Sequence, residues 1–105
     1  MSRPVYTPQQ MEILCQTPDI RVAEITLPPF GKTPPHRHSR TKEVCYCLEG
    51  ELTCQTPDTP EGILHAGQRR DFPVGSTHTL ANLGNVPCRF LLIHEGGEFD
   101  FVESE

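Results

Sequence analysis

Short runs of alternating apolar and polar residues, separated by turn residues, recur along the whole chain. The clearest run is residues 20–27, where Ala23, Ile25 and Leu27 share one face with Arg21, and polar Glu24 and Thr26 lie on the other with Val22. Alternation with a period of two predicts a half-buried β-strand. The next segment, residues 28–35, contains four prolines and is expected to form an irregular loop, because proline cannot donate to a sheet ladder.

The same pattern predicts a series of short strands between turn signals. They are expected over residues 11–16, 41–48, 52–56, 63–66, 69–72, 78–82 and 86–94, with a further candidate over 98–102. Seven to nine strands at a spacing of roughly 8–12 residues are typical of an antiparallel sandwich or barrel. Because exposed sheet edges promote aggregation, we expect closure as a barrel or as a jelly roll paired with a second subunit, and we favour the jelly roll.

Composition narrows the class of protein. The chain has 105 residues, which indicates one domain, with residues 1–16 as an N-terminal arm. Its 11 prolines and 8 glycines argue against a helical bundle. Five cysteines, an odd number with no CxxC pair, favour a reducing cytosol, and we expect a cytoplasmic protein. A net charge of −5 without a block of basic residues argues against nucleic-acid binding. The sequence has no long apolar run, so we expect neither a membrane span nor a secretory signal.

One segment, residues 31–50, concentrates candidate metal ligands. His36 and His38 are two residues apart, so on a strand both imidazoles project to the same face and can reach one ion. Glu43 lies five residues beyond His38, an offset that places it on the opposite face of a regular strand. It can join the histidines only if the chain bends within residues 39–42. Alone, this pattern also fits exposed polar side chains beside a proline-rich loop.

A second segment, residues 67–82, supplies another histidine. The strand predicted at 69–72 ends in Pro73-Val-Gly75, a turn that redirects the chain, and His78 then begins the following strand. His78 can therefore point into the same interior as the first two histidines.

Together the two segments resemble the two sequence motifs of the cupin superfamily. The second segment matches the pattern G-x5-P-x-G-x2-H-x3-N at every fixed position, from Gly67 to Asn82. The first matches HxH, then Glu43 after four residues and Gly50 after six. It departs only at Gly31, which precedes His36 by four intervening residues where five are usual.

The resemblance implies a small antiparallel jelly-roll β-barrel in which His36, His38, Glu43 and His78 bind one metal. Three imidazoles and one carboxylate suit Fe, Mn, Ni, Co, Cu or Zn better than Ca or Mg. With neutral histidines, a divalent ion in this site keeps a formal charge of about +1, which favours an anionic or enolisable oxygen ligand. Four protein ligands on an octahedral ion leave two positions for substrate, water or dioxygen.

Other residues are candidates for roles around the metal. Arg70 shares the parity of Phe72, so it is a candidate to hold a substrate carboxylate, although it also fits a solvated rim. Cys45 and Cys47 share the parity of Glu43 and are expected to be buried apolar groups, as are the other cysteines, Cys15, Cys54 and Cys88. His65 and His94 match no motif position and are expected at the surface or behind the ligands. Structural roles are expected for Gly50, at a positive-φ bend, and Asn82, in a turn.

The resemblance leaves several functions open, because the cupin superfamily uses one scaffold for different activities. Our leading hypothesis is an oxygenase acting on a small organic acid, enol or diketone chelated to the metal, with Glu43 as a candidate proton acceptor. The alternatives are a non-oxidative metalloenzyme, namely an isomerase, cyclase or decarboxylase, and a ligand-binding or sensing domain without turnover. We also expect a homodimer, because a small jelly roll with an N-terminal arm can protect its edges by pairing strands between subunits.

Overall fold

A computed structural model describes residues 10–104, and its regular structure is entirely β. The strands, in chain order, are β1 (Gln10–Gln16), β2 (Ile20–Leu27), β3 (His36–Arg37), β4 (Lys42–Glu49), β5 (Glu51–Gln55), β6 (Gly62–His65), β7 (Arg69–Phe72), β8 (Thr79–Ala81), β9 (Cys88–Glu95) and β10 (Val102–Glu103). Residues 10–104 contain no helix that is long and apolar enough to cross a membrane. The all-β architecture expected from the alternating pattern is confirmed.

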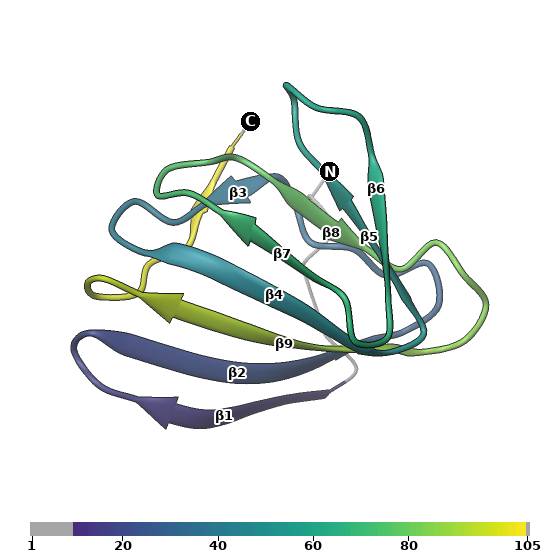
Figure 1. The fold of residues 1–105 in the computed structure, drawn as a ribbon, viewed down its shortest axis with the longest axis horizontal. Helices are drawn as coiled ribbons and strands as arrows, with labels where there is room; N and C mark the ends of the chain where they lie inside the picture. The colour runs from purple at the N-terminus through teal and green to yellow at the C-terminus, as the bar shows by residue number, and fades with distance from the viewer. Residues whose placement is uncertain (1–9, 105) are drawn as a thin grey trace, which may run out of the picture.

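The strands form two antiparallel layers that face each other. One is a five-stranded sheet in the order β1-β2-β9-β4-β7. The other combines the ladders β6-β5-β8 and β10-β3, which meet where His36 and His78 form an isolated bridge. Figure 1 shows β1, β2, β9 and β4 stacked in one layer, with β3, β8, β5 and β6 above them. Several neighbouring strands are far apart in the chain, as β2 and β9 are, and such long-range pairing is the arrangement of a jelly roll.

The hydrophobic core lies between the layers. On β9, residues alternate strictly between buried and half-buried positions, so Phe90 and Leu92 face inward between Cys88 and His94. Their neighbours in the core include Leu27, Leu52 and Leu80. Cys45, Cys47, Cys54 and Cys88 belong to the same core, as expected.

The expectation that Cys15 is buried is wrong. It lies on β1, whose seven residues are all exposed, because β1 is the edge of its sheet and the second layer does not cover it. The predicted arm of residues 1–16 is seen here only as β1, since residues 1–9 lie outside the described part.

Two differences from the predicted strands affect the site. A short strand, β3, carries His36, and the strand expected at 98–102 is reduced to β10 at Val102–Glu103. Residues 98–101 are bound differently: the carboxylate of Asp100 accepts hydrogen bonds from the backbone N–H of Ser39, 2.7 Å away, and from its hydroxyl. This bonding replaces a sheet ladder and fixes the C-terminal segment across the end of β3.

The bend that Glu43 requires lies between β3 and β4. Residues 38–41 have no strand structure and carry the chain from one layer to the other. The parity of one continuous strand therefore does not apply, and His38 and Glu43 approach each other from opposite layers.

Gly50 and Asn82 have the structural roles expected of them. Gly50 joins β4 to β5 at a φ of 77°, and a Cβ there would lie 2.9 Å from the carbonyl oxygen of Pro87. The buried side-chain amide of Asn82 donates to the carbonyls of Leu27, Pro28 and Val86, and its oxygen accepts from the N–H of Gly84 at 3.0 Å. Asn82 thus ties the loop after β2 to the loop before β9.

Candidate metal centre

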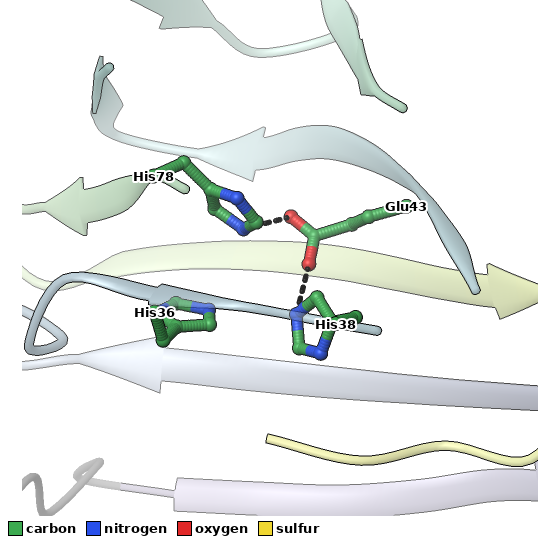
Figure 2. Close-up of side chains that lie close together, drawn as sticks. All are labelled: His36, His38, Glu43 and His78. Carbon is green, nitrogen blue, oxygen red and sulfur yellow. Dashed lines mark ion pairs between the residues drawn. The ribbon is translucent and has the colours of Figure 1, made fainter. Parts of the chain in front are cut away.

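Four buried side chains from both layers converge at one point between the sheets. His36 and His38 come from β3 and the residue that follows it, His78 directly precedes β8, and Glu43 lies on β4. One ligand atom from each of the four lies within 4.8 Å of all the others. Each of these residues is at most 3% exposed. Figure 2 shows His38 and His78 pointing at the Glu43 carboxylate, with His36 beside them.

Backbone carbonyls set the tautomer of these three histidines. The Nδ1 atoms of His36 and His78 lie 2.9 Å from the carbonyl oxygens of Pro34 and Ser76, and Nδ1 of His38 lies 2.6 Å from that of Asp100. Because a carbonyl oxygen only accepts, each Nδ1 must carry the hydrogen, and the neutral ring then presents a lone pair at Nε2. Histidines that bind metals are held in this way.

The inward-facing atoms lack hydrogen-bond partners. His38 Nε2 lies 3.0 Å from Glu43 Oε1, and His78 Nε2 lies 3.2 Å from Oε2. Among the described residues, neither nitrogen nor Oε2 has a partner in hydrogen-bond geometry. Buried lone pairs on neutral rings beside a carboxylate repel one another unless a cation lies between them. The donor set therefore fits a divalent metal ion.

The charge states follow from burial and proximity. Burial raises the pKa of Glu43, but the surrounding histidines outweigh this effect and hold that pKa well below its ordinary value, so the carboxylate is ionised. Burial lowers the pKa of His36 to about 4, which keeps its ring neutral and able to bind a metal at neutral pH. For His38, burial also acts downward, yet the adjacent Glu43 carboxylate and the Asp100 carbonyl raise the pKa overall.

A cavity of about 200 Å³ opens beside the histidines. His36, His38 and His94 line it, and the remaining lining is mainly apolar; the other residues are Met11, Arg21, Ile25, Thr33, Leu80, Phe90, Leu92, Phe99 and Phe101. Phe101 stacks on the His36 ring at a centroid distance of 4.2 Å, and the Arg21 guanidinium lies 4.0 Å from the centre of the Phe99 ring. The C-terminal segment therefore forms one wall of the cavity.

Arg70 is not among the residues that line this cavity. Its side chain lies over the Phe72 ring at 5.1 Å, donates to the Thr59 hydroxyl at 3.1 Å and lines a second hollow formed by residues 56–59 and 70–77. The arginine beside the histidines is Arg21. A substrate role for Arg70 stays a prediction, as does proton acceptance by Glu43.

Of the two histidines outside the motifs, one lies at the surface and the other lies behind the ligands. His65 is exposed on β6, next to Glu51 at 3.3 Å. His94 is 1% exposed and lies behind the ligands, with its Nε2 2.8 Å from Glu43 Oε1. The sequence contained a signal for His94 and Arg21, because each occupies the inward parity of a predicted strand; motif matching gave them no weight.

The buried cysteines are packing residues of the core, and burial makes their thiols unreactive. Burial raises the pKa of the Cys45 thiol well above its ordinary value and that of Cys54 to about 11. These groups are therefore protonated at neutral pH, when neither nucleophilic attack nor metal binding is favoured.

One family model and several curated relatives match this chain. Residues 23–102 match the family described as the Cupin domain. The germin-like protein subfamily 1 member 20 of Arabidopsis thaliana is 31% identical over 79 residues, which cover 69% of this chain and 36% of that protein. The chain thus matches about a third of the length of such curated relatives.

Solved structures share the fold at lower identity. A Klebsiella pneumoniae protein with a double-stranded β-helix domain superposes with a TM-score of 0.82 at 21% identity, covering 98% of this chain and 90% of that one. An oxalate oxidase gives 0.74 at 22% identity, covering 81% and 46% of the two chains. The polyketide cyclase RemF from Streptomyces resistomycificus gives 0.77 at 23% identity, covering 90% and 70%.

Proposed function

Because the chain belongs to the cupin superfamily, we propose that it binds one divalent transition metal through His36, His38, Glu43 and His78 and acts there on a small organic ligand. The observation that carries this proposal is the convergence of three histidines, held as Nδ1–H tautomers, on one buried carboxylate. Nitrogen and oxygen donors of this kind suit Fe, Mn, Ni, Co, Cu or Zn.

The cavity limits the ligand to a small and largely apolar molecule. Its volume of about 200 Å³ is below the range of about 300–1,000 Å³ for sites that take drug-sized ligands. Arg21 provides a positive charge in the wall and is paired in register with His94 across β2 and β9. A ligand that placed one oxygen at the metal could bring a carboxylate close to the Arg21 guanidinium, where a charge-assisted hydrogen bond can form. Phe99 and Phe101 would shield it from water.

The reaction we favour is oxygenation of a small organic acid, enol or diketone. The bound metal would supply Lewis acidity and an orienting point for the substrate oxygen. The chain would contribute the apolar walls, the carboxylate contact at Arg21 and the fixed imidazoles. Similarity of the fold to an oxalate oxidase supports this choice.

A non-oxidative reaction, namely isomerisation, cyclisation or decarboxylation, is the second candidate. It would use the same metal and the same wall, with the substrate held as an enolate. Similarity of the fold to the cyclase RemF supports it. A domain that binds its ligand without turnover is the third outcome that the experiment must distinguish.

The test begins with elemental analysis of protein purified without chelator or added metal. We expect about one equivalent of metal in the parent and none in the His36→Ala/His78→Ala variant. Protein that retained no metal and took up none on reconstitution would overturn the proposal. Iron would favour oxygenation, and dioxygen consumption on addition of a candidate diketone or keto acid would establish it; zinc or nickel without dioxygen uptake would favour the non-oxidative reaction.

The ligand class is tested separately at the two arginines. Replacement of Arg21 by Met removes the charge from the cavity wall, so KM for a carboxylate substrate should rise by about tenfold or more, as expected for the loss of a charge-assisted hydrogen bond. Arg70→Met serves as the matched control. An effect at Arg70 with none at Arg21 would assign the substrate contact to Arg70 instead.

A further inference from the structure

A fourth histidine, His94, is buried against the candidate metal ligand Glu43. The two residues lie on neighbouring strands, β9 and β4, and are directly paired in register. Both side chains therefore emerge from the same face of the sheet. His94 Nε2 lies 2.8 Å from Glu43 Oε1, and each of these side chains is 1% exposed.

The chemistry of the pair fixes the direction of its hydrogen bond. His94 Nε2 lies at hydrogen-bond distance from a carboxylate oxygen, and a carboxylate oxygen accepts, so His94 donates through Nε2–H and keeps its lone pair at Nδ1. This tautomer is the reverse of that in His36, His38 and His78, whose Nδ1 atoms donate to backbone carbonyls. With a hydrogen on Nε2, His94 cannot bind a metal through the atom that faces the site.

The hydrogen bond distinguishes the two oxygens of the carboxylate. Oε1 accepts from His94, whereas Oε2 has no partner in hydrogen-bond geometry among the described residues. Oε1 also lies 3.0 Å from His38 Nε2, but Oε2 is the oxygen that can bind an ion without loss of the hydrogen bond to His94. Rotation of the carboxylate that presented Oε1 instead would break this buried hydrogen bond.

We propose that His94 is a positioning residue, which holds the Glu43 carboxylate through Oε1 so that Oε2 is presented to the metal. Packing keeps the imidazole in place, since its ring centre lies 4.3 Å from that of His38 and 4.8 Å from that of Phe99. The inference rests on the metal site of the proposed function and is independent of the reaction performed there.

Zn²⁺ binding to the metal-free full-length protein tests the proposal. His94→Phe keeps an aromatic ring but removes the donor, and we expect the Zn²⁺ dissociation constant to rise about 10- to 100-fold, the usual effect of losing a group that orients a metal ligand. His94→Gln can place an N–H₂ group near the position of Nε2, so it should remain within a few-fold of the parent. His65→Gln, at an exposed histidine, controls for a change in histidine content.

Two spectroscopic measurements exclude other roles for His94. In Cu²⁺-loaded protein, pulsed EPR should detect the same histidine nitrogens in the parent and in His94→Phe; loss of one would make His94 a ligand and overturn the proposal. In the metal-free parent, ¹⁵N NMR should show the Nε2–H tautomer for His94 and Nδ1–H for His36 and His78. A hydrogen at Nδ1 of His94, with Nε2 unprotonated, would remove the proposed donor and overturn the proposal, and this measurement needs no variant.

Three results of the Zn²⁺ titrations would contradict either the role of His94 or the metal site itself. Equal Zn²⁺ affinities of the parent and His94→Phe would show that the hydrogen bond does not position Glu43. Equal losses in His94→Phe and His94→Gln would show that only packing of the ring matters, and would overturn the proposal too. A parent that bound no Zn²⁺ would refute the proposed function itself, which separates that failure from a failure of the inference about His94.

Discussion

Among single residues, the hydrogen-bond partner of each buried group determines its chemistry. The three candidate histidine ligands donate to backbone carbonyls, so their tautomer depends on main-chain geometry more than on neighbouring side chains. His94 has a carboxylate as its partner and takes the opposite tautomer. Four imidazoles within one interior therefore divide into three that can bind a metal and one that can orient a ligand.

The inward cysteines lead to a prediction about thiol reactivity. In a Cys15→Ser background, the four core thiols should react with a chromogenic disulfide reagent at pH 8 only after unfolding. Burial raises the pKa of Cys54 to about 11 and that of Cys88 to about 12, from an ordinary value of 9.0. For Cys54 this lowers the thiolate fraction at pH 8 by about a hundredfold, since one pKa unit is a factor of ten.

The measurement is the absorbance of the released reagent, followed first in buffer and then in concentrated urea. Cys88→Ala and Cys54→Ala in the same background identify any thiol that reacts early. A core thiol that reacted in the folded state as fast as a free thiol would contradict this expectation. If that thiol were Cys45, a chemical role next to Glu43 would have to be reconsidered.

Among the elements, local patterns predict the long strands well and the short ones poorly. Residues 20–27 alternate over a full strand, and β2 has the predicted bounds. β3 and β10 have two residues each, too few for any alternation to be visible, and they pair with each other across more than sixty positions of sequence. The sequence contains no local trace of that long-range pairing.

The same reasoning explains which parts of the site could be predicted. His36, His38, Glu43 and His78 fall in motifs, and the structure brings them together. The offset of five residues between His38 and Glu43 predicted that the chain bends between them. The form of that bend, in which residues 38–41 cross from one layer to the other, depends on the tertiary fold. The C-terminal phenylalanines meet the cavity only through contacts between distant segments, so composition and spacing could not identify them. For Arg21 the inward parity of its predicted strand was the only signal.

The turn from β4 to β5 supports a prediction about a single element. Gly50→Ala should lower the free energy of unfolding by more than the roughly 1–2 kcal/mol that a positive φ costs an L-residue. The reason is that its Cβ would also lie 2.9 Å from the carbonyl oxygen of Pro87 and 3.2 Å from Cα of Cys88. Urea unfolding followed by circular dichroism measures the change.

Gly67→Ala is the matched control for this turn. Gly67 has a φ of 89°, and a Cβ there would meet nothing within 4 Å, so the substitution isolates the backbone strain. The difference between the two losses of unfolding free energy is the cost of the close contact with Pro87 and Cys88 at the start of β9. Equal losses at both positions would show that the backbone relaxes around Gly50 and that the close approach is unimportant.

For the whole molecule, the uncovered edge strand supports a proposal about assembly. All seven residues of β1 are exposed, including Met11, Ile13 and Leu14, and within residues 10–104 β1 pairs with β2 alone. An edge with free backbone groups and apolar side chains favours pairing with another strand. We propose that two copies associate through β1 to form a homodimer, since closed two-fold dimers are the commonest oligomers of a single chain.

Light scattering coupled to size exclusion tests the assembly at micromolar concentration. The parent should have twice the chain mass of 11.8 kDa, and Leu14→Lys should shift it to the monomer, because a charged side chain on an edge opposes strand pairing. Ile63→Lys places the same charge on β6, the edge of the other layer, where Ile63 is 52% exposed. It should leave the dimer intact if β1 is the interface. Dissociation by Ile63→Lys with Leu14→Lys still dimeric would move the interface to β6, and a monomeric parent would refute the dimer altogether.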